Sequence, residues 1–258
     1  MPLTLTNDKV THWDIRKIAV IGPGIVGMHM AAMLAHVGAK ADNSEPAEVV
    51  VVQRASKTSG WKVTAINEGR SPIGGVEPEL DDVVKKSVAD KRLRATSDYS
   101  EIADADVVLV CVQTDRCGPE PDYGPMFSAL GELTRALQGK PAGNVPLVVF
   151  ESTLAPSSMA TVIREFFAAH GLHEGKDVLL GNSPNRVMPG RLVERVRSSD
   201  KLVAGLHAET PELIHRLYSQ IVTEGELHRC NSLTAEIVKT LENAYRDVRI
   251  AFATELVR

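Results

Sequence analysis

Three glycines near the start of the chain, Gly22, Gly24 and Gly27, have the spacing of a pyrophosphate-binding turn. In such a turn the first glycine permits the tight bend and the second lets the backbone approach the phosphates. The third lets the following helix pack closely against the preceding strand. Ile25 and Val26 would supply N–H groups in the first turn of that helix, where the positive end of the helix dipole favours an anion. These residues therefore indicate phosphate chemistry, with dinucleotide binding as the expected outcome.

The elements needed to position these glycines lie directly beside them. Residues 18–21 are an apolar run typical of a buried strand, and residues 25–37 follow an alanine- and methionine-rich helical pattern. Glycines at this spacing alone are weak evidence, but strand, turn and helix in immediate succession are the context that the motif requires. We therefore predict a dinucleotide-binding turn rather than a chance glycine turn.

The second predicted strand, residues 49–52, bears on which cofactor is bound. It ends in Gln53-Arg54, where NAD-binding domains carry an acidic residue that accepts hydrogen bonds from the adenosine ribose. A nearby arginine accommodates the 2′-phosphate of NADP instead. One hypothesis is that Arg54 does this, helped by Ser56 and Lys57. The alternative is that Arg54 is a solvated loop residue and the ribose is held otherwise, with NAD as the cofactor.

Composition limits the classes of protein to consider. The 258 residues are 43% hydrophobic and carry a net charge of −4, which argues against a general binder of nucleic acid or membrane surfaces. No stretch approaches the roughly 18 apolar residues of a membrane span. Three scattered cysteines form neither a disulfide framework nor a metal-ligand spacing, so we expect no metal site. These features indicate a cytoplasmic α/β protein.

Alternating strand and helix patterns predict a doubly wound parallel sheet of the Rossmann type. Residues 1–16 are polar and are expected to be a loose lead-in, and 116–125 and 182–191 are expected to be loops. Further strands are predicted at 107–112, 146–150, 177–180 and 202–206, and helices at 61–66, 78–89, 126–137, 157–170 and 211–223.

The last stretch, residues 234–258, predicts one long helix capped by Thr234, with Glu242 and Arg246 as an i,i+4 ion pair. The pattern stops without a glycine or proline, so we expect the chain to be shorter than the unit to which it belongs. The helix carries an apolar face for a core or a partner, made of positions 238, 241, 245, 248, 252 and 256.

Several stretches, in order along nearly the whole chain, resemble the UDP-glucose/GDP-mannose dehydrogenase family of nucleotide-sugar 6-dehydrogenases. The resemblance implies oxidation of the C6 alcohol of a UDP- or GDP-linked sugar to a uronate by two nicotinamide cofactors, through a cysteine thioester. The stretches are 22–27, 66–73 with 77–78, 110–114, 151–156, 183–190 and the helix 235–246.

The resemblance also implies roles for individual residues. Thr114 and Ser152 would line the nicotinamide side of the cofactor site, and Thr153 would position the hydrolytic water, although Thr153 could instead cap the next helix. Lys239 and Asn243 lie at i,i+4, so an ammonium and an amide can face one developing oxyanion. They could also form a solvated face, but asparagine is a poor helix former and needs a reason in mid-helix.

A basic cluster follows the predicted strand 177–180. Arg186 and Arg191, with Arg195 and Arg197, suit an anionic diphosphate substrate, although they could also be a solvated charged face.

Two positions depart from the family pattern. Asn185 stands where the family has a glutamate, and an amide cannot act as a general base. Glu151 could supply that base or could be a hydrogen-bonded structural carboxylate. None of the three cysteines has the glycine- and histidine-rich context of the family's nucleophile, which would follow residue 258. We therefore expect this chain to bind cofactor without turning over a sugar nucleotide by itself.

The expected organisation is a lead-in at 1–16, an NAD(P)-binding domain at 17–230, and a linking helix at 231–258 that begins a second, mostly missing domain. The helix would form a homodimer contact through residues 234–258. One alternative is a β-hydroxyacid dehydrogenase of the 6-phosphogluconate dehydrogenase type, which also pairs a glycine turn with a Lys-x-x-x-Asn helix. The other is a non-catalytic, truncated cofactor-binding module.

Overall fold

The structure is a computed structural model that describes residues 3–6, 8–43, 45–118, 120–140, 144–186 and 189–257. Within these ranges the central element is an eight-stranded sheet with the order β12-β11-β10-β9-β6-β3-β4-β5. All neighbouring strands are parallel except β10 and β11. The strands of this sheet are β3 (Lys17–Ile21), β4 (Glu48–Val52), β5 (Leu93–Thr96), β6 (Val107–Val110), β9 (Leu147–Phe150), β10 (Leu179–Asn182), β11 (Lys201–Gly205) and β12 (Leu227–Asn231).

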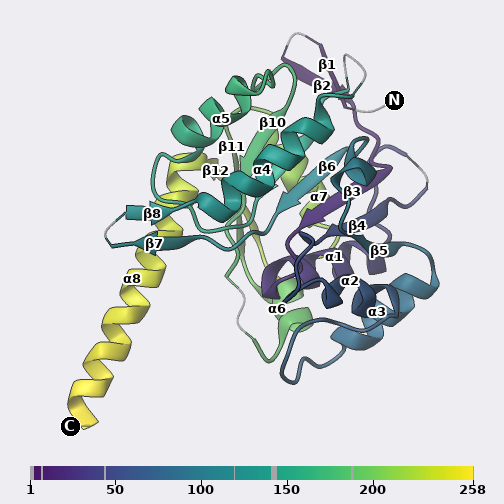
Figure 1. The fold of residues 1–258 in the computed structure, drawn as a ribbon. Helices are drawn as coiled ribbons and strands as arrows, with labels where there is room; N and C mark the ends of the chain where they lie inside the picture. Colours follow the sequence, from purple (N-terminus) through teal and green to yellow (C-terminus); the bar gives the residue numbers. More distant parts are fainter. Residues whose placement is uncertain are drawn as a thin grey trace.

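Helices cover both faces of this sheet (Figure 1), and each face has its own apolar core. Because alternate residues of a strand point to opposite faces, Ile18 and Val20 of β3 join one core while Ala19 and Ile21 join the other. The helices are α1 (Ile25–Val37), α2 (Trp61–Asn67), α3 (Leu80–Ala89), η1 (Tyr99–Ile102), α4 (Gly124–Leu137), η2 (Met159–Ile163), α5 (Arg164–Ala169), α6 (Leu192–Ser198), α7 (Thr210–Tyr218) and α8 (Ser232–Val257).

The doubly wound α/β fold expected from the sequence is confirmed, including the bounds of α1. Strands β5 and β12 and helix α6 were not expected. The segment 116–125 was predicted to be a loop, but it contains the hairpin β7 (Asp115–Cys117) and β8 (Glu120–Asp122). These elements span only three to seven residues each, so hydrophobic periodicity has too few positions to reveal them.

The lead-in is more ordered than its polar composition suggested. Strands β1 (Thr4–Thr6) and β2 (Lys9–His12) form an antiparallel hairpin. Trp13 and Ile15 beyond it are completely buried, and the Trp13 backbone N–H donates to Asp42 Oδ2 at 2.8 Å. The expectation of a loose segment was therefore wrong, because two large apolar side chains outweigh the polar residues around them.

The antiparallel pairing of β10 and β11 is the one departure from a parallel sheet. The connection between them contains α6, which packs against α1 rather than crossing the sheet to the amino end of the next strand. The chain thus re-enters the sheet from the edge at which it left. This return keeps Asn185 and Pro189 at the cavity beside the carboxyl ends of the parallel strands, where ligands bind in sheets of this kind.

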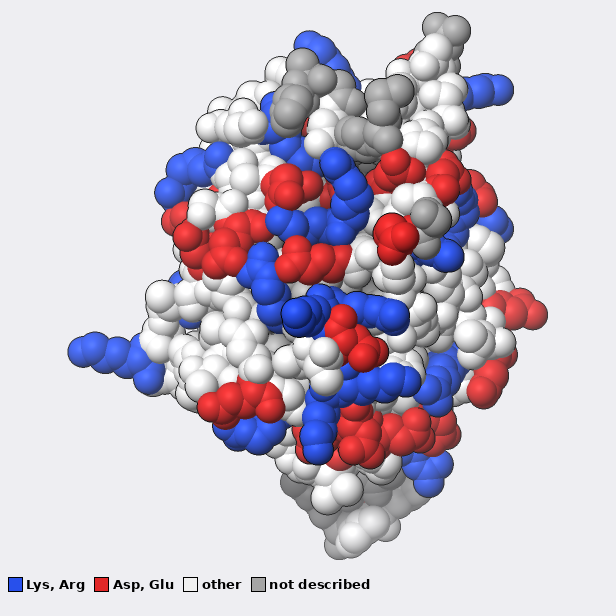
Figure 2. Space-filling model, turned by 90° about the vertical axis from the view of Figure 1, so that its right-hand side faces the viewer, with Lys and Arg blue, Asp and Glu red and all other residues white. Residues whose placement is uncertain are grey.

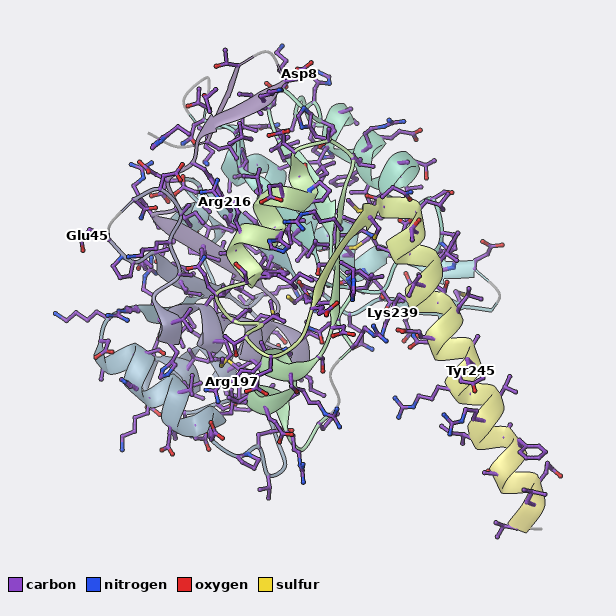
Figure 3. All side chains as sticks on the ribbon, turned by 180° about the vertical axis from the view of Figure 1, so that it is seen from behind. Asp8, Glu45, Arg197, Arg216, Lys239 and Tyr245 are labelled. Atoms are coloured by element: carbon purple, nitrogen blue, oxygen red, sulfur yellow. The ribbon has the colours of Figure 1, made fainter. Side chains whose placement is uncertain are left out.

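Helix α8 begins against the body and then extends away from it (Figures 1 and 3). Its first turn is capped by Asn231, whose Oδ1 accepts from the Thr234 backbone N–H at 2.8 Å, so the prediction of Thr234 as the cap was wrong. The buried Glu236 accepts from the backbone N–H groups of Ser157, at 2.7 Å, and Met159, at 2.8 Å. This carboxylate therefore fixes the start of α8 to the segment that follows β9.

Candidate functional site

The glycine turn has the geometry expected of a phosphate-binding loop. Gly22 has a φ of +95°, and a Cβ added there would lie 2.8 Å from the carbonyl oxygen of Cys111. A Cβ on Gly27 would lie 2.0 Å from the carbonyl oxygen of Gly22, so only glycine permits this close packing. Gly24 has no other atom within 4 Å of an added Cβ and opens onto a cavity. The turn therefore fits a pyrophosphate, which needs an approachable backbone at the start of α1.

The cavity beside this turn has a volume of about 1270 Å³ and lies at the carboxyl ends of β3, β4, β6 and β9. Residues of α4 and α8 complete its walls. Gly27, Arg186, Arg191 and Asn243 do not line it. The expected site residues that do line it are Gly22, Gly24, Ile25, Val26, Gln53, Arg54, Thr114, Glu151, Ser152, Thr153, Asn185 and Lys239.

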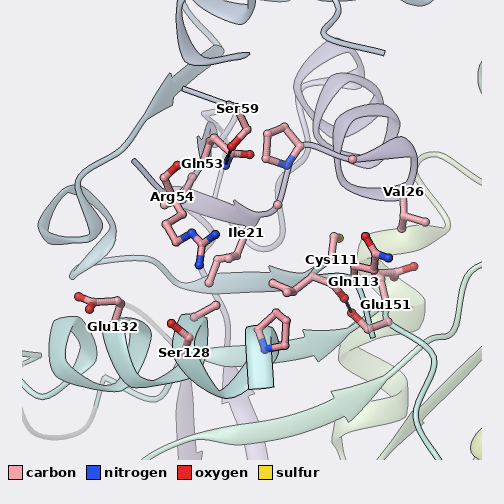
Figure 4. A pocket seen from close by; sticks show the side chains of 18 of the residues that line it. Ile21, Val26, Gln53, Arg54, Ser59, Cys111, Gln113, Ser128, Glu132 and Glu151 are labelled. Carbon is pink, nitrogen blue, oxygen red and sulfur yellow. Dashed lines mark hydrogen bonds between the residues drawn. The ribbon is translucent and has the colours of Figure 1, made fainter. Parts of the chain in front are cut away.

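At one end of the cavity, Gln53 and Arg54 follow β4 (Figure 4). The Gln53 amide donates to Ser59 Oγ and to the Arg54 carbonyl oxygen, both at 3.0 Å. The exposed Arg54 side chain extends toward the part of α4 that carries Ser128 and Glu132. We call this region, defined by Gln53, Arg54, Ser59, Ser128 and Glu132, the outer end of the cavity.

At the other end, polar side chains join the strands of the sheet at their carboxyl ends. Thr114 Oγ1 donates to the Thr153 carbonyl oxygen at 2.8 Å, and Ser152 Oγ donates to the Val112 carbonyl oxygen at 2.5 Å. Thr153 makes no helix cap, because Glu236 accepts from Met159 N–H at the start of the next helix. The residues predicted to line the nicotinamide side thus lie close together. The hydroxyls of Thr114 and Ser152 already donate to backbone carbonyl oxygens.

Beneath this end lies a buried polar network that the sequence did not reveal. The Glu151 carboxylate accepts from Lys201 Nζ at 2.6 Å and from Tyr218 Oη at 2.5 Å. It also accepts from Asn185 Nδ2 at 3.3 Å, while Lys201 donates to the Ser183 carbonyl oxygen at 2.9 Å. Glu151 is 2% exposed and Tyr218 is fully buried, so these charges are largely removed from solvent. Both Glu151 oxygens are therefore occupied, as in a structural carboxylate.

Burial controls the protonation of the groups around this network. Loss of solvation lowers the pKa of His29 to about 4, with a smaller contribution from the positive charge of Lys201, so His29 is neutral near pH 7. Burial, reinforced by the Glu151 charge, raises the pKa of Tyr218 and of Cys111 well above their usual values. Tyr218 is thus a proton donor to Glu151, and Cys111 remains a thiol rather than a reactive thiolate.

Lys239 and Asn243 were expected to share one face toward the site, and the structure separates them. Lys239 is half-buried and lines the cavity, whereas Asn243, one turn further along α8, is exposed and lies outside it. Figure 3 shows Lys239 beside the body and Tyr245 on the extended part of the helix. Burial lowers the pKa of Lys239, and the charges of Arg186, Lys201 and Arg246 lower it further, against the opposite effect of Glu242.

The predicted basic cluster is largely paired with carboxylates. Arg186 forms an ion pair with Glu242 of α8, which replaces the expected Glu242–Arg246 pair. Arg191 lies 3.6 Å from Glu194, and Arg197 lies 3.4 Å from Glu79. Residues 187 and 188, within the expected substrate loop, lie outside the described residues.

The side of the molecule seen in Figure 2 carries no continuous positively charged face among its described residues. Figure 2 shows Lys and Arg interspersed with Asp and Glu over the described residues of one side of the molecule. A helix with the length and apolar character needed to cross a membrane is also lacking in the described ranges.

A glycine turn between a parallel strand and a helix, opening onto a cavity at a sheet's carboxyl edge, defines a Rossmann-type dinucleotide-binding domain. Residues 16–222 match the model of the UDP-glucose/GDP-mannose dehydrogenase family, NAD binding domain. The chain belongs to this family, and its cofactor is NAD. The resemblance inferred from the sequence is thereby confirmed, and the alternative of a 6-phosphogluconate-type dehydrogenase is disfavoured.

Individual relatives agree with this assignment. The chain is 30% identical over 93% of its length to a UDP-N-acetyl-D-mannosamine dehydrogenase of Pyrococcus horikoshii, covering 52% of that protein. It is 31% identical over 96% of its length to an NDP-N-acetyl-D-galactosaminuronic acid dehydrogenase of Ralstonia nicotianae, covering 55% of that relative. The chain thus spans about half the length of the curated relatives it matches.

Solved structures give the same result. The crystal structure of an NDP-N-acetyl-D-galactosaminuronic acid dehydrogenase from Methanosarcina mazei superposes with a TM-score of 0.81 at 33% identity, covering 94% of this chain and 50% of that one. Fold and family therefore agree over residues 16–222, which hold every strand of the described eight-stranded sheet except β12.

Proposed function

We propose that this chain is the cofactor-binding part of a dehydrogenase that oxidises the C6 alcohol of a nucleotide-linked sugar to a carboxylate. The reaction would transfer two hydrides to two NAD molecules. One observation carries the proposal: Lys239, from the far end of the chain, lines the same cavity as Gly24 and Thr153. An ammonium group thus faces the space in which a dinucleotide and an alcohol would meet.

The residues of this chain would act by binding and orientation. The backbone around Gly24 and the first turn of α1 would hold the pyrophosphate. NAD, when bound, supplies the hydride acceptor. Thr114 and Ser152 keep the cavity floor in place through their bonds to neighbouring backbone. Lys239, half-buried and with a lowered pKa, would stabilise negative charge that develops on the sugar oxygen.

We assign Glu151 a structural role rather than that of a general base. Its oxygens already accept from Lys201, Tyr218 and Asn185, so taking a proton from water would compete with these bonds and weaken the ion pair with Lys201. Asn185 is no base either, since an amide has no basic lone pair at neutral pH. Thr153 remains our candidate for positioning water, because it lines the cavity and its hydroxyl does not cap a helix.

We propose that the oxidation proceeds through a cysteine thioester whose sulfur is not one of the three cysteines here. Cys111 lines the cavity but is only partly exposed, and burial raises the pKa of its thiol well above the usual value, so it holds its proton; burial also raises the pKa of Cys230. Cys117 is exposed on the β7–β8 hairpin and does not line the cavity. The 258-residue chain would therefore bind NAD but not oxidise a sugar nucleotide by itself.

The nucleotide sugar would carry an N-acetylated hexosamine, as in the names of the relatives from Pyrococcus and Ralstonia. Arg186 and Arg191 would approach its diphosphate from the loop beyond β10. The unpaired cysteines suit a reducing compartment, and we propose the cytoplasm.

A second copy of the chain would cover the exposed apolar side of α8. Leu241, Tyr245, Val248 and Phe252 are each more than 60% exposed there. Sedimentation of the wild type and of a Leu241→Lys, Phe252→Lys double variant would test this contact, because the double variant should sediment as a monomer.

The cofactor role is tested by calorimetric titration of the chain with NAD, together with an absorbance assay for NADH in the presence of UDP-N-acetylmannosamine. We expect saturable NAD binding and no NADH. Production of NADH that depends on the sugar nucleotide would contradict the assignment of the cysteine, and absence of NAD binding would contradict the site itself.

A further inference from the structure

We propose that the outer end of the cavity accepts a 2′-phosphate, so that this domain binds NADP as well as NAD, with Arg54 as the residue that determines this specificity. The inference rests on the proposed function, since it concerns the adenosine half of the same dinucleotide site. It goes beyond the family assignment, which concerns NAD alone.

The first observation is the absence of a carboxylate at the end of β4. An NAD-specific domain places a carboxylate there, which accepts from the ribose hydroxyls and repels a 2′-phosphate. Here the position is Gln53, whose amide nitrogen donates to Ser59 Oγ and to the Arg54 carbonyl oxygen. The neutral Gln53 Oε1 can still accept from a ribose hydroxyl, but it does not repel a 2′-phosphate.

The second observation is the Arg54 guanidinium. Arg54 lines the cavity, its side chain is exposed, and it extends from the end of β4 toward α4 (Figure 4). Within the described ranges, the Arg54 guanidinium makes no hydrogen bond and no ion pair. A planar guanidinium with five donors suits a phosphate, which can accept two parallel hydrogen bonds from it.

The neighbouring carboxylates do not neutralise Arg54. Glu132 Oε1 lies 2.5 Å from Arg135 of the same helix. Asp98 Oδ1 accepts from the Ser100 backbone N–H at 2.8 Å and caps η1. Glu132 is thus neutralised by Arg135, whereas Asp98 keeps its negative charge beside a neutral donor. Neither carboxylate forms an ion pair with Arg54 among the described residues, so the guanidinium keeps its positive charge for an incoming anion.

The residues after Arg54 add to the positive character of this end. Lys57 is exposed in the turn between β4 and α2, and Lys62 lines the cavity, with Nζ 3.4 Å from the Pro23 carbonyl oxygen of the glycine turn. A dianionic phosphate at the ribose would therefore meet two cationic side chains that line the cavity, Arg54 and Lys62, with Lys57 in the adjoining turn outside the lining. The long-range part of this attraction falls with salt, so binding should be compared at one ionic strength.

A competing role for Arg54 is to stack on the adenine ring. Stacking would contribute equally to NAD and NADP, whereas a contact with the 2′-phosphate contributes to NADP alone. The two roles are separated by measuring both cofactors on the same variants.

The experiment is calorimetric titration of the wild-type chain, Arg54→Gln, Gln53→Asp and Arg229→Gln with NAD and NADP. Parallel titrations use 2′,5′-ADP and 5′-AMP, which isolate the phosphate. Arg229→Gln is the matched control, because it removes one positive charge outside the cavity, from an arginine paired with Glu212.

We expect the wild type to bind NADP with a Kd no more than about threefold above that for NAD. Arg54→Gln should weaken NADP by about tenfold or more relative to NAD, in line with loss of a charged contact. Gln53→Asp should weaken NADP by a similar factor, and Arg229→Gln should leave the ratio unchanged. The ratio of 2′,5′-ADP to 5′-AMP affinity should follow the same order.

A wild-type preference for NAD above that threefold limit would overturn the inference while leaving the cofactor site intact. Equal weakening of NAD and NADP by Arg54→Gln would also overturn it, in favour of stacking. If neither dinucleotide binds the wild type, the proposed function fails together with the inference.

Discussion

The two ends of the cavity are built in opposite ways. The inner end rests on Glu151, Lys201 and Tyr218, which are buried, charged or polar, and bonded to one another. The outer end presents Arg54, whose exposed guanidinium makes no ion pair or hydrogen bond within the described residues. A ligand that spans the cavity would meet a rigid floor at one end and a free cation at the other.

Because of this difference, we expect the inner end to contribute to folding stability and the outer end to contribute to cofactor affinity. A buried ion pair that loses one partner leaves an unpaired charge in a poorly solvated place, so its cost appears in folding. An exposed charge has little to lose on folding, so its effect appears only when a ligand binds. We therefore expect substitutions at the inner end to change the free energy of unfolding, and substitutions at the outer end to change cofactor binding.

The largest effect is expected for Lys201→Met at the inner end. This change leaves the Glu151 carboxylate buried without its cation, which should lower the free energy of unfolding by about 3–5 kcal/mol. Urea denaturation followed by circular dichroism measures it. The double variant Lys201→Met, Glu151→Gln is the control and should regain part of the loss; a loss below about 1 kcal/mol in the single variant would contradict the account of this network.

The next effect is a dependence of stability on pH through His29. Its folded-state pKa of about 4 is below the ordinary 6.5, so the unfolded chain takes up this proton first as pH falls. The contribution of neutral His29 to the free energy of unfolding is fully present above pH 6.5. It decreases as the pH falls toward the folded-state pKa, by roughly 2–3 kcal/mol at about pH 4.5.

The measurement is the change in unfolding free energy between about pH 7.5 and pH 4.5 for wild type and for His29→Gln, which does not titrate. The wild type should lose more than the variant. Equal losses would show that other groups, and not the buried imidazole, cause the acid sensitivity.

The glycine turn lies between the two ends and offers a matched pair of variants. Gly27→Ala places a methyl group against the Gly22 carbonyl oxygen, so we expect a loss of about 1–3 kcal/mol of stability. Gly24→Ala meets no protein atom, so stability should hold while the methyl group enters the cavity. NAD binding should then fall by about tenfold, since the pyrophosphate needs that backbone. A stability loss in Gly24→Ala equal to that of Gly27→Ala would contradict this distinction.

The smallest effect on folding is expected for Arg54→Gln at the outer end. An exposed side chain without an ion pair should change the free energy of unfolding by no more than about 0.5 kcal/mol. Thermal and urea denaturation of the variant check this. A larger loss would mean that Arg54 holds the fold, and the contrast between the two ends would disappear.

Much of the fold was readable because the signals were local. The apolar runs of β3 and β4 and the helical pattern of α1 each occupy consecutive residues, so period and turn chemistry sufficed. The same holds for the glycine turn, because the positive φ of Gly22 and the close approach of Gly27 to the Gly22 carbonyl oxygen arise within one short stretch of chain. The cofactor-side residues Thr114, Ser152 and Thr153 came from a family resemblance tied to consecutive motifs, and the fold gathers them at one cavity.

Contacts between distant segments were beyond sequence reasoning. Lys201 and Tyr218 are 50 and 67 residues from Glu151, and neither position carries a motif that reveals the bond. The pairing of Arg186 with Glu242 displaced a plausible local pair for the same reason. A helical i,i+4 spacing likewise placed Lys239 and Asn243 on one face, but could not tell where α8 leaves the body.

Residue type and spacing along the chain were thus enough to predict the fold class, the phosphate turn and the family. Only the packed chain decided which carboxylate is neutralised, which arginine stays free, and which residue of α8 reaches the cavity. The physical reason is that backbone conformation and amphipathic pattern depend on near neighbours. The energy of a buried charge depends on whichever groups folding brings within a few ångströms of it.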